Sequence, residues 1–271
     1  MLISATNLLY FSPTRTTQAI VRTIAQGVGL PTREFDFTHL STSPATPVFG
    51  QNELAVVGLP VYMGRVPSAA NAYLRTLNAE GAPCIVVGVY GNRAFDDYLV
   101  ELEDILREQG FLPVAAAAFI GEHSITSALG TGRPNPDDLA LATEFGKHTA
   151  NKLEAADSVP VLAAGKIPGN RPYETYSAKA SKKKDGEKVA NGPTVDDLCT
   201  NCKLCVSVCP IDNINPDNVR DINPYECLRC HACVRNCPAD AIRFLKPGFI
   251  RHVKDLENSF SKPDKTPLLV L

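Results

Sequence analysis

Eight of the nine cysteines in this 271-residue chain occur in two copies of one spacing. Each copy reads C-x-x-C-x-x-C-x-x-x-C and is followed by proline. The first copy is Cys199, Cys202, Cys205 and Cys209, and the second is Cys227, Cys230, Cys233 and Cys237. Thiolates at this spacing are ligands of [4Fe–4S] clusters, so the sequence predicts two clusters.

In this type of repeat the fourth cysteine of each copy binds the cluster of the other copy. We therefore expect one cluster on Cys199, Cys202, Cys205 and Cys237, and the second on Cys227, Cys230, Cys233 and Cys209. Eight thiolates complete two clusters. His231, which stands among these cysteines, is therefore expected at the surface or behind the ligands, not as a ligand.

Structural zinc and disulfides are the alternatives for these cysteines. Zinc sites typically use two CxxC pairs separated by a longer loop, whereas here three cysteines recur at every third position in both copies. The N-terminus lacks the basic region and cleavage-site pattern of a secretory signal, so closely spaced disulfides are not expected.

Length and composition limit the classes of protein to consider. A chain of 271 residues predicts two domains, and 44% hydrophobic residues can fill a sizeable core. The formal net charge of −2 gives no support to nucleic-acid binding. The apolar run Val114–Ile120 is too short for a membrane span. We expect a cytoplasmic protein of an anaerobic or reducing cell.

Residues 1–156 alternate apolar runs with helical patterns. Strands are expected at 7–11, 35–37, 54–59, 84–90 and 114–120, the last with some helical character because of its four alanines. Helices are expected over a segment that Gly29 ends, and at 67–77, 95–109 and 137–155. This alternation predicts an α/β domain with a doubly wound, five-stranded parallel sheet covered by helices on both faces.

The rest of the chain divides into a linker and a second domain. Residues 157–194 are rich in proline and glycine and include the lysine run 182–184, which is either solvated chain or a docking patch for an acidic partner. Residues 195–271 are expected to form a small α+β domain with the clusters. Its tail is expected to carry one helix near 250–260 and the apolar end Leu268–Leu271, which needs a surface to cover it.

Polar and aromatic residues follow several of the expected strands, where such sheets bind ligands. The first strand leads into Ser12–Thr17, whose hydroxyls and helix N-terminus suit a phosphate. Tyr62 and Tyr90 follow the third and fourth strands, where a flat ring could stack on them. Residues 121–124 lie on the same edge; for Glu122 and His123, bonding within the loop and a redox or docking role stay open.

These segments resemble a known family. Phe11–Thr17 is similar to the flavodoxin phosphate loop, and the loops at Tyr62 and Tyr90 are similar to its two ring-binding loops. With the cysteine repeat behind them, the chain resembles the flavodoxin–ferredoxin fusion proteins of anaerobic bacteria and archaea. The resemblance implies noncovalent FMN on Ser12, Thr14, Arg15, Thr16, Thr17, Pro60, Val61, Tyr62, Met63, Gly64, Tyr90, Gly91, Asn92 and Arg93.

Arg15 is a departure from that family, because flavodoxins usually carry glycine there. Its side chain could pair with the phosphate, lie in solvent or crowd the site. Cys84 begins a buried strand and is expected to be an inert core thiol.

Clusters move single electrons, whereas FMN can hold one or two. We therefore expect an electron carrier that connects two [4Fe–4S] clusters, FMN and a redox partner protein, with no catalytic residues of its own. The alternatives are an FMN- and iron–sulfur-dependent reductase of a small molecule, and a ferredoxin whose sheet domain docks without flavin. The sequence leaves open a homodimer.

Overall fold

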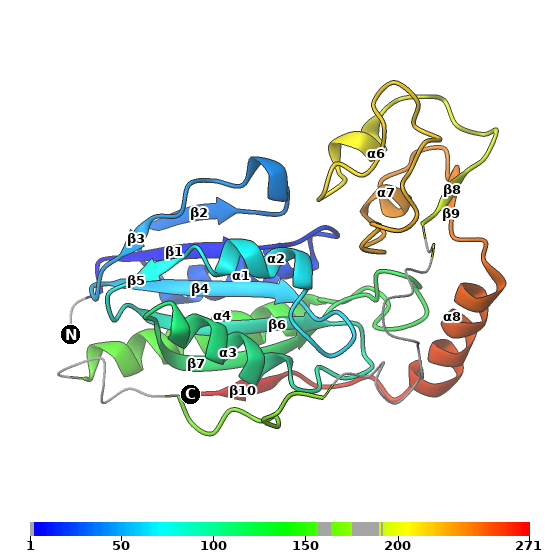
Figure 1. Cartoon of the computed structure of the whole chain (residues 1–271). Coiled ribbons are helices and arrows are strands. Elements are labelled where there is room, and N and C mark those ends of the chain that lie inside the picture. The colour runs from blue at the N-terminus through cyan, green and yellow to red at the C-terminus, as the bar shows by residue number, and fades with distance from the viewer. Residues whose placement is uncertain (1–2, 157–163, 175–189, 191) are drawn as a thin grey trace.

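The computed structural model of the chain describes residues 3–156, 164–174, 190 and 192–271. The lysine run 182–184 and most of the expected linker lie outside the described residues. Figure 1 shows a layered sheet domain and a smaller cysteine-bearing segment beside the ends of its strands.

The central sheet contains β1 (Ala5–Tyr10), β2 (Thr32–Asp36), β4 (Glu53–Pro60), β6 (Pro83–Tyr90), β7 (Leu112–Ile120) and β10 (Leu268–Val270). Its strand order is β10-β7-β6-β4-β1-β2, and the first five strands in chain order pair in parallel. This is the flavodoxin-like order 2-1-3-4-5, with its switch point between β1 and β4. The predicted five-stranded parallel sheet is confirmed, and β10 adds a sixth, antiparallel strand.

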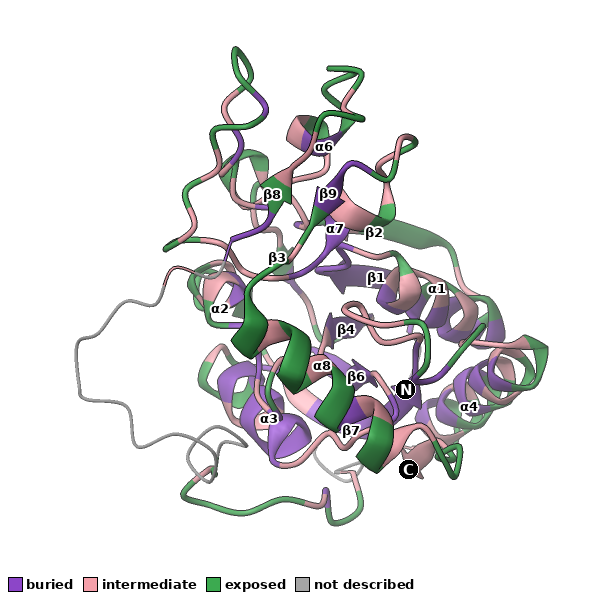
Figure 2. Ribbon diagram, turned by 90° about the vertical axis from the view of Figure 1, so that its right-hand side faces the viewer, coloured by how far each residue is buried: buried purple, intermediate pink, exposed green. Residues whose placement is uncertain are grey.

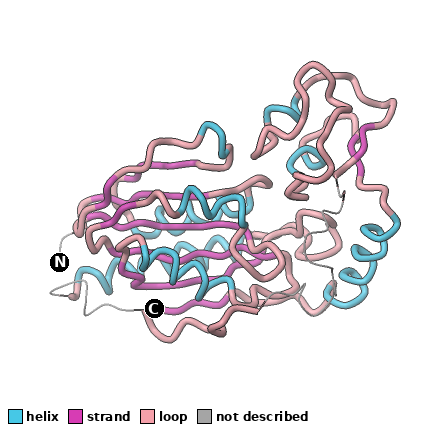
Figure 3. Tube along the Cα trace, viewed as in Figure 1, coloured by secondary structure: helices cyan, strands magenta, loops and turns pink. Residues whose placement is uncertain are grey.

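Helices cover both faces of the sheet, as Figure 3 shows. On one face, α1 (Thr16–Val28) and α4 (Pro136–Glu154) bury one apolar core, and on the other α2 (Ser68–Leu74) and α3 (Tyr98–Glu108) bury a second. The strands β4 and β6 are buried on both faces, which explains their unbroken apolar sequences. The alanines at 115–118 are wholly buried in β7. Because they pair with β6, they form a strand and not a helix.

Two helices are shorter than predicted, for reasons visible in the backbone. α3 begins at Tyr98 instead of Phe95 because Asp96 has a φ of 46°, outside the helical region. α2 ends at Leu74 instead of Leu77, where the chain changes to the tighter i to i−3 bonds of a 3₁₀ turn. A 3₁₀ turn, η1 (Leu40–Thr42), and a short parallel pair, β3 (Val48–Phe49) with β5 (Asn78–Ala79), were not predicted.

Part of the expected linker packs on the sheet domain. Ile167 is buried in the same core as α3, and the Asn170 backbone and side-chain N–H groups donate to the Asp97 carboxylate. Arg171 forms an ion pair with Asp104 at 2.6 Å. Residues 164–174 are thus attached along α3.

The cysteine-bearing segment contains β8 (Thr194–Val195), α6 (Leu204–Ser207), α7 (Ala232–Arg235) and β9 (Ile242–Arg243). β8 and β9 pair antiparallel and close the segment. α8 (Pro247–Phe260) then runs back toward the sheet domain, and β10 pairs with β7. The apolar chain end therefore joins the first sheet, although the sequence grouped it with the second domain. In the described part of the chain, no helix is both long and apolar enough to cross a bilayer.

Close packing of α1 on α4 gives the first testable prediction. A Cβ atom on Gly146 would lie 2.2 Å from the carbonyl oxygen of Ile24, whereas a Cβ on Gly248 in α8 would contact nothing within 4 Å. Since overpacking of a core typically costs about 1–3 kcal/mol, Gly146→Ala should lower the free energy of unfolding by that amount. The matched control Gly248→Ala should not lower it, because alanine favours helix. Urea titration of both variants measures this; equal stabilities would contradict the prediction.

Candidate metal centres and the carboxyl edge of the sheet

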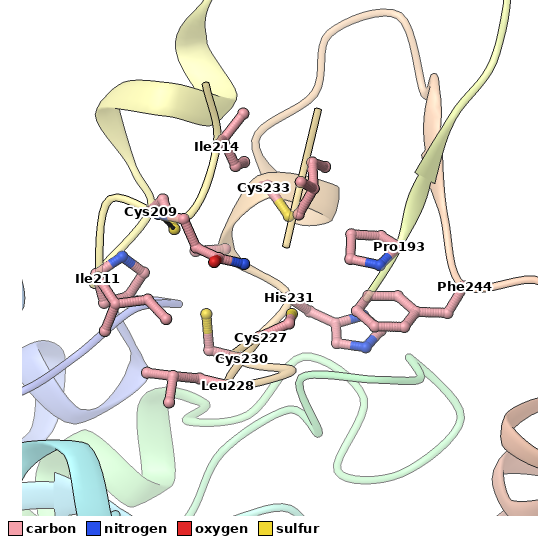
Figure 4. A pocket seen from close by; sticks show the side chains of 14 residues that line it. Pro193, Cys209, Ile211, Ile214, Cys227, Leu228, Cys230, His231, Cys233 and Phe244 are labelled. Atoms are coloured by element: carbon pink, nitrogen blue, oxygen red, sulfur yellow. Dashed lines mark hydrogen bonds between the residues drawn. The ribbon is translucent and has the colours of Figure 1, made fainter. Parts of the chain in front are cut away.

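The eight cysteines line two pockets, four in each. The inner pocket is lined by Cys209, Cys227, Cys230 and Cys233, and the outer pocket by Cys199, Cys202, Cys205 and Cys237. The fourth cysteine of each copy thus lies in the pocket of the other copy, as crossed ligation requires. Figure 4 shows the labelled cysteines around the inner pocket, with Leu228 nearby.

The two copies have nearly the same backbone geometry. Lys203 and His231, at corresponding positions, both have a φ of 61° and both precede a four-residue helix. The amides of Asn201 and Arg229 both donate to the sulfur two residues earlier, at 3.4 Å. Backbone N–H groups that point at sulfur stabilise its negative form and tune the potential of a bound cluster.

The chemistry of the inner pocket fits an iron–sulfur cluster. Burial raises the pKa of Cys230 to about 12, and burial together with the neighbouring sulfur atoms raises the pKa of Cys233. Such thiols keep their protons until a positive centre displaces them. None of the described residues lining the inner pocket is Lys or Arg, although the charge of Arg229 acts on Cys227. A positively charged metal core would therefore suit these sulfur atoms.

His231 is buried, with 5% of its surface exposed, so of the two expected positions it takes the one behind the cysteines and not the one at the surface. Its ring stacks on Phe244 at 4.3 Å and on Phe249 at 5.7 Å, and it lines the inner pocket. Burial lowers its pKa to about 3, so the ring is neutral. The corresponding residue of the outer pocket, Lys203, is exposed, as is Cys202. The two pockets therefore differ in the exposure of corresponding residues around them.

At the edge of the sheet, the loop after β1 leads into the N-terminus of α1. The hydroxyl oxygen of Ser12 accepts from the amide of Gln18 at 3.0 Å. The amides of Thr14, Thr16 and Thr17 have no acceptor among the described residues. Free amides at a helix N-terminus attract anions.

Thr17 carries the clearest sign of a missing ligand at this loop. It is 1% exposed, and its Oγ1 has no hydrogen-bond partner in the described chain. A buried hydroxyl without a partner is costly, and a phosphate oxygen would satisfy it. The residues present therefore fit a phosphate group.

Arg15 has a φ of 65° and lies exposed at the N-cap of α1. This left-handed conformation suits glycine, which explains the residue usual in flavodoxins. The exposed position does not crowd the loop.

The loop after β4 is a tight hairpin at the same edge. Pro60 and Val61 are half-buried and lead into Tyr62, whose amide and carbonyl both bond to Arg65 at 3.0 Å. Met63 and Gly64, at the tip, have φ of 55° and 81°. Arg65 pairs with Glu101 at 2.6 Å, which fixes the hairpin to α3.

The loop after β6 carries Tyr90, Gly91, Asn92 and Arg93, which were expected to bind the flavin. Tyr90 is 6% exposed and packs edge-on against Phe95, so most of its ring is covered. Asn92 is wholly buried, and its side chain bonds the C-terminal tail. Gly91 has no room for a Cβ atom, which would meet the ring of His123 at 2.4 Å. Arg93 forms an ion pair with Asp96. The side chains of this loop are thus engaged within the protein.

The inner pocket lies against this edge. The amide of Leu40 donates to the carbonyl of Pro210, beside Cys209, at 2.9 Å. Leu228, beside Cys227, packs on the apolar core on which Tyr62 also packs. Burial, followed by the charges of Cys230 and Cys227, raises the pKa of Tyr62 well above its usual value. The expected ring loop and the inner pocket are therefore neighbours.

An ion pair joins the cysteine-bearing segment to the loop after β7. Arg235 of α7 pairs with Glu122 and donates to the carbonyls of His123 and Ser124. The loop after β7 therefore docks the cysteine-bearing segment. Sequence reasoning did not find Arg235, because nothing in the cysteine spacing distinguishes it from other residues between ligands.

Comparisons with known proteins give one family-model match and several similar solved structures. Residues 198–242 match the family model of the 4Fe-4S dicluster domain. A flavodoxin from the domain Archaea is 14% identical over 55% of this chain and 99% of its own, with a TM-score of 0.41. The Fusobacterium nucleatum flavodoxin bound to flavin mononucleotide is 17% identical over 55% of this chain and 98% of its own, with a TM-score of 0.38. A search of curated proteins found no match.

The strand order of the sheet and the family match rest on different residues and lead to one conclusion. The sheet has the doubly wound order 2-1-3-4-5, and the cysteine repeat lies in a recognised iron–sulfur domain. The chain joins an α/β domain of flavodoxin-like strand order to a segment that matches the 4Fe-4S dicluster domain.

Proposed function

We propose that this chain is an electron-transfer flavoprotein that holds one [4Fe–4S] cluster in each pocket and FMN at the carboxyl edge of the sheet. In this proposal residues 1–156 form the flavin domain, and its electrons are exchanged with a redox partner protein. Bound clusters would supply one-electron steps, and FMN would supply one- or two-electron steps.

The residues divide the work of holding these groups. Ser12 and the free amides of Thr14, Thr16 and Thr17 would bind the phosphate, with the buried Thr17 hydroxyl as a further donor. Pro60–Gly64 would line the ring, with Tyr62 against it. Gly91 would contribute its backbone, because the side chains of Tyr90, Asn92 and Arg93 have partners within the protein.

The contact between the inner pocket and the edge of the sheet is the observation that carries this proposal. Pro210 and Leu228 line the inner pocket; Pro210 accepts a hydrogen bond from Leu40, and Leu228 packs on the same apolar core as Tyr62. The charges of Cys230 and Cys227 contribute to the raised pKa of Tyr62. The outer pocket carries the exposed Cys202 and Leu204. A cluster in the outer pocket would lie near the surface, and one in the inner pocket would lie against the carboxyl edge of the sheet. This arrangement suits an electron relay from a partner protein through both clusters to the flavin.

Replacing the fourth cysteine of each copy by alanine tests which residues bind each cluster. Cys209→Ala should remove the cluster of the inner pocket, and Cys237→Ala that of the outer pocket, because each lines the pocket of the other copy. Iron analysis under anaerobic conditions should fall from about eight to about four per chain in each variant. Electron paramagnetic resonance of each reduced variant should show one remaining cluster. Loss of the cluster of the same copy would contradict the crossing, and tightly bound zinc without sulfide would contradict both clusters.

Thr17→Val tests the phosphate site. The change keeps the side-chain shape and removes a buried hydroxyl that lacks a partner. FMN binding should weaken by about 1.5–3 kcal/mol, the usual worth of a hydrogen bond to a charged group. The stability of the FMN-free protein should not fall. Fluorescence titration with FMN and urea unfolding measure the two effects; unchanged affinity would place the phosphate elsewhere.

Arg15→Gly is the contrasting variant. Since Arg15 has left-handed backbone geometry, glycine should stabilise the FMN-free protein by about 1 kcal/mol. Exposed charge pairs are worth about 0–1 kcal/mol, so the dissociation constant for FMN should rise less than about fivefold. A larger loss would mean that Arg15 clamps the phosphate.

Rapid mixing of the oxidised protein with a low-potential one-electron donor tests the relay. The iron–sulfur absorbance should bleach first, and the flavin should follow at a rate independent of protein concentration. A flavin that reacts directly with the donor, at the same rate in Cys209→Ala, would contradict the relay. Saturable turnover of a small-molecule acceptor would instead indicate a reductase.

A further inference from the structure

The side chain of Asn92 is wholly buried and holds the C-terminal tail. Its Nδ2 donates to the carbonyl of Phe260 at 2.9 Å and to that of Pro263 at 3.3 Å. Its Oδ1 accepts from the amide of Lys265 at 2.8 Å. One residue of the flavodoxin-like domain thus binds three backbone groups at the end of α8.

Asparagine is well suited to this position. Asn92 has a φ of 59°, a conformation open mainly to Gly, Asn and Asp. Of these three, only Asn carries both a donor and an acceptor, and the tail presents two carbonyls and one amide.

The tail that Asn92 holds is continuous with the inner pocket. At the start of α8, Phe249 stacks on His231, which lines that pocket. Near its end, Glu257 accepts a hydrogen bond from Thr126 in the loop after β7. Beyond Lys265, β10 pairs with β7. Figure 2 shows α8 as a largely exposed helix beside the domain, so its ends carry the attachment.

We propose that Asn92 is a positioning residue. Its hydrogen bonds hold the tail after α8, and through α8 they set the position of the inner pocket against the carboxyl edge of the sheet, where the flavin is proposed to bind. This assignment rests on the proposed function for its consequence, but the hold itself is a property of the chain without cofactors. It gives Asn92 a different role from the flavin contact that its place in the loop suggested.

The experiment compares Asn92→Gly and Asn92→Asp with the unchanged chain. Glycine keeps the left-handed backbone and removes the three bonds, whereas aspartate keeps the acceptor for Lys265 and loses the donors. Aspartate also gives a second variant if glycine loosens the domain. Hydrogen exchange of individual amides is the first measurement.

Three groups of amides report on the proposal. Those of Lys265 and β10 report on the tail, and that of Leu40 reports on docking, because it bonds Pro210 beside the inner pocket. The amides of β4 in the sheet centre are the control. In Asn92→Gly, exchange at the tail and at Leu40 should accelerate at least tenfold, with β4 unchanged. Asn92→Asp should accelerate exchange at the tail at least as much, because its carboxylate would face the carbonyl oxygens of Phe260 and Pro263.

A second measurement separates positioning from flavin binding. In the FMN-loaded protein with both clusters, Asn92→Gly should slow reduction of the flavin by the clusters at least tenfold. The dissociation constant for FMN and the iron content should change less than about twofold.

Each contrary result overturns a named part. Unchanged exchange at the tail would disprove the hold, and a fast tail with a protected Leu40 would disprove positioning. A large loss of FMN affinity with unchanged exchange would make Asn92 a flavin ligand. If clusters never reduce the flavin in the unchanged chain, the relay falls, whereas the hold is still decided by the exchange rates.

Discussion

Each metal pocket depends on cysteines from both copies of the repeat. Cys209 lies with the second copy and Cys237 with the first. Neither copy can therefore complete a four-thiol pocket alone. The two copies, which lie 28 residues apart in the sequence, form one structural unit because each contributes a cysteine to the other's pocket. With few buried apolar side chains in this segment, metal binding would supply much of its folding free energy. The rest of the arrangement depends on this unit, because the contacts with the sheet come from residues beside its cysteines.

The repeat is symmetric in sequence but its surroundings are not. In the first copy Lys203 and Leu204 are exposed. The corresponding residues of the second copy, His231 and Ala232, are buried. The inner half is covered by Phe244, Phe249 and the edge of the sheet, whereas the outer half carries the exposed Cys202 and Lys203. Exposure and hydrogen bonding to sulfur both change cluster potentials. The two sets of four cysteines thus lie in different surroundings, so bound clusters would differ in potential.

Sequence patterns gave the parts of the molecule that repeat or alternate. The strand–helix alternation predicted the sheet, because β4 and β6 are apolar throughout and buried on both faces. The loop at Thr17 was found because ligand sites follow strand ends. By contrast, β10 and the role of Asn92 depend on contacts between segments 150 or more residues apart in the chain. The burial of His231 depends on the rings of Phe244 and Phe249, of which only Phe249 lies in α8. The spacing of apolar residues within one segment does not reveal such contacts between distant segments.

The chain segments that precede and follow the cysteine-bearing segment are both attached to the sheet domain. Before it, residues 164–174 are attached to α3 through Asp97 and Asp104, and after it β10 is part of the sheet. A flexible linker of about 38 residues alone would allow separations near 35 Å. A second attachment removes most of that freedom and raises the effective concentration of one part near the other. Contacts as small as Leu40 with Pro210, or Arg235 with Glu122, can then hold the inner pocket in place although each is weak alone.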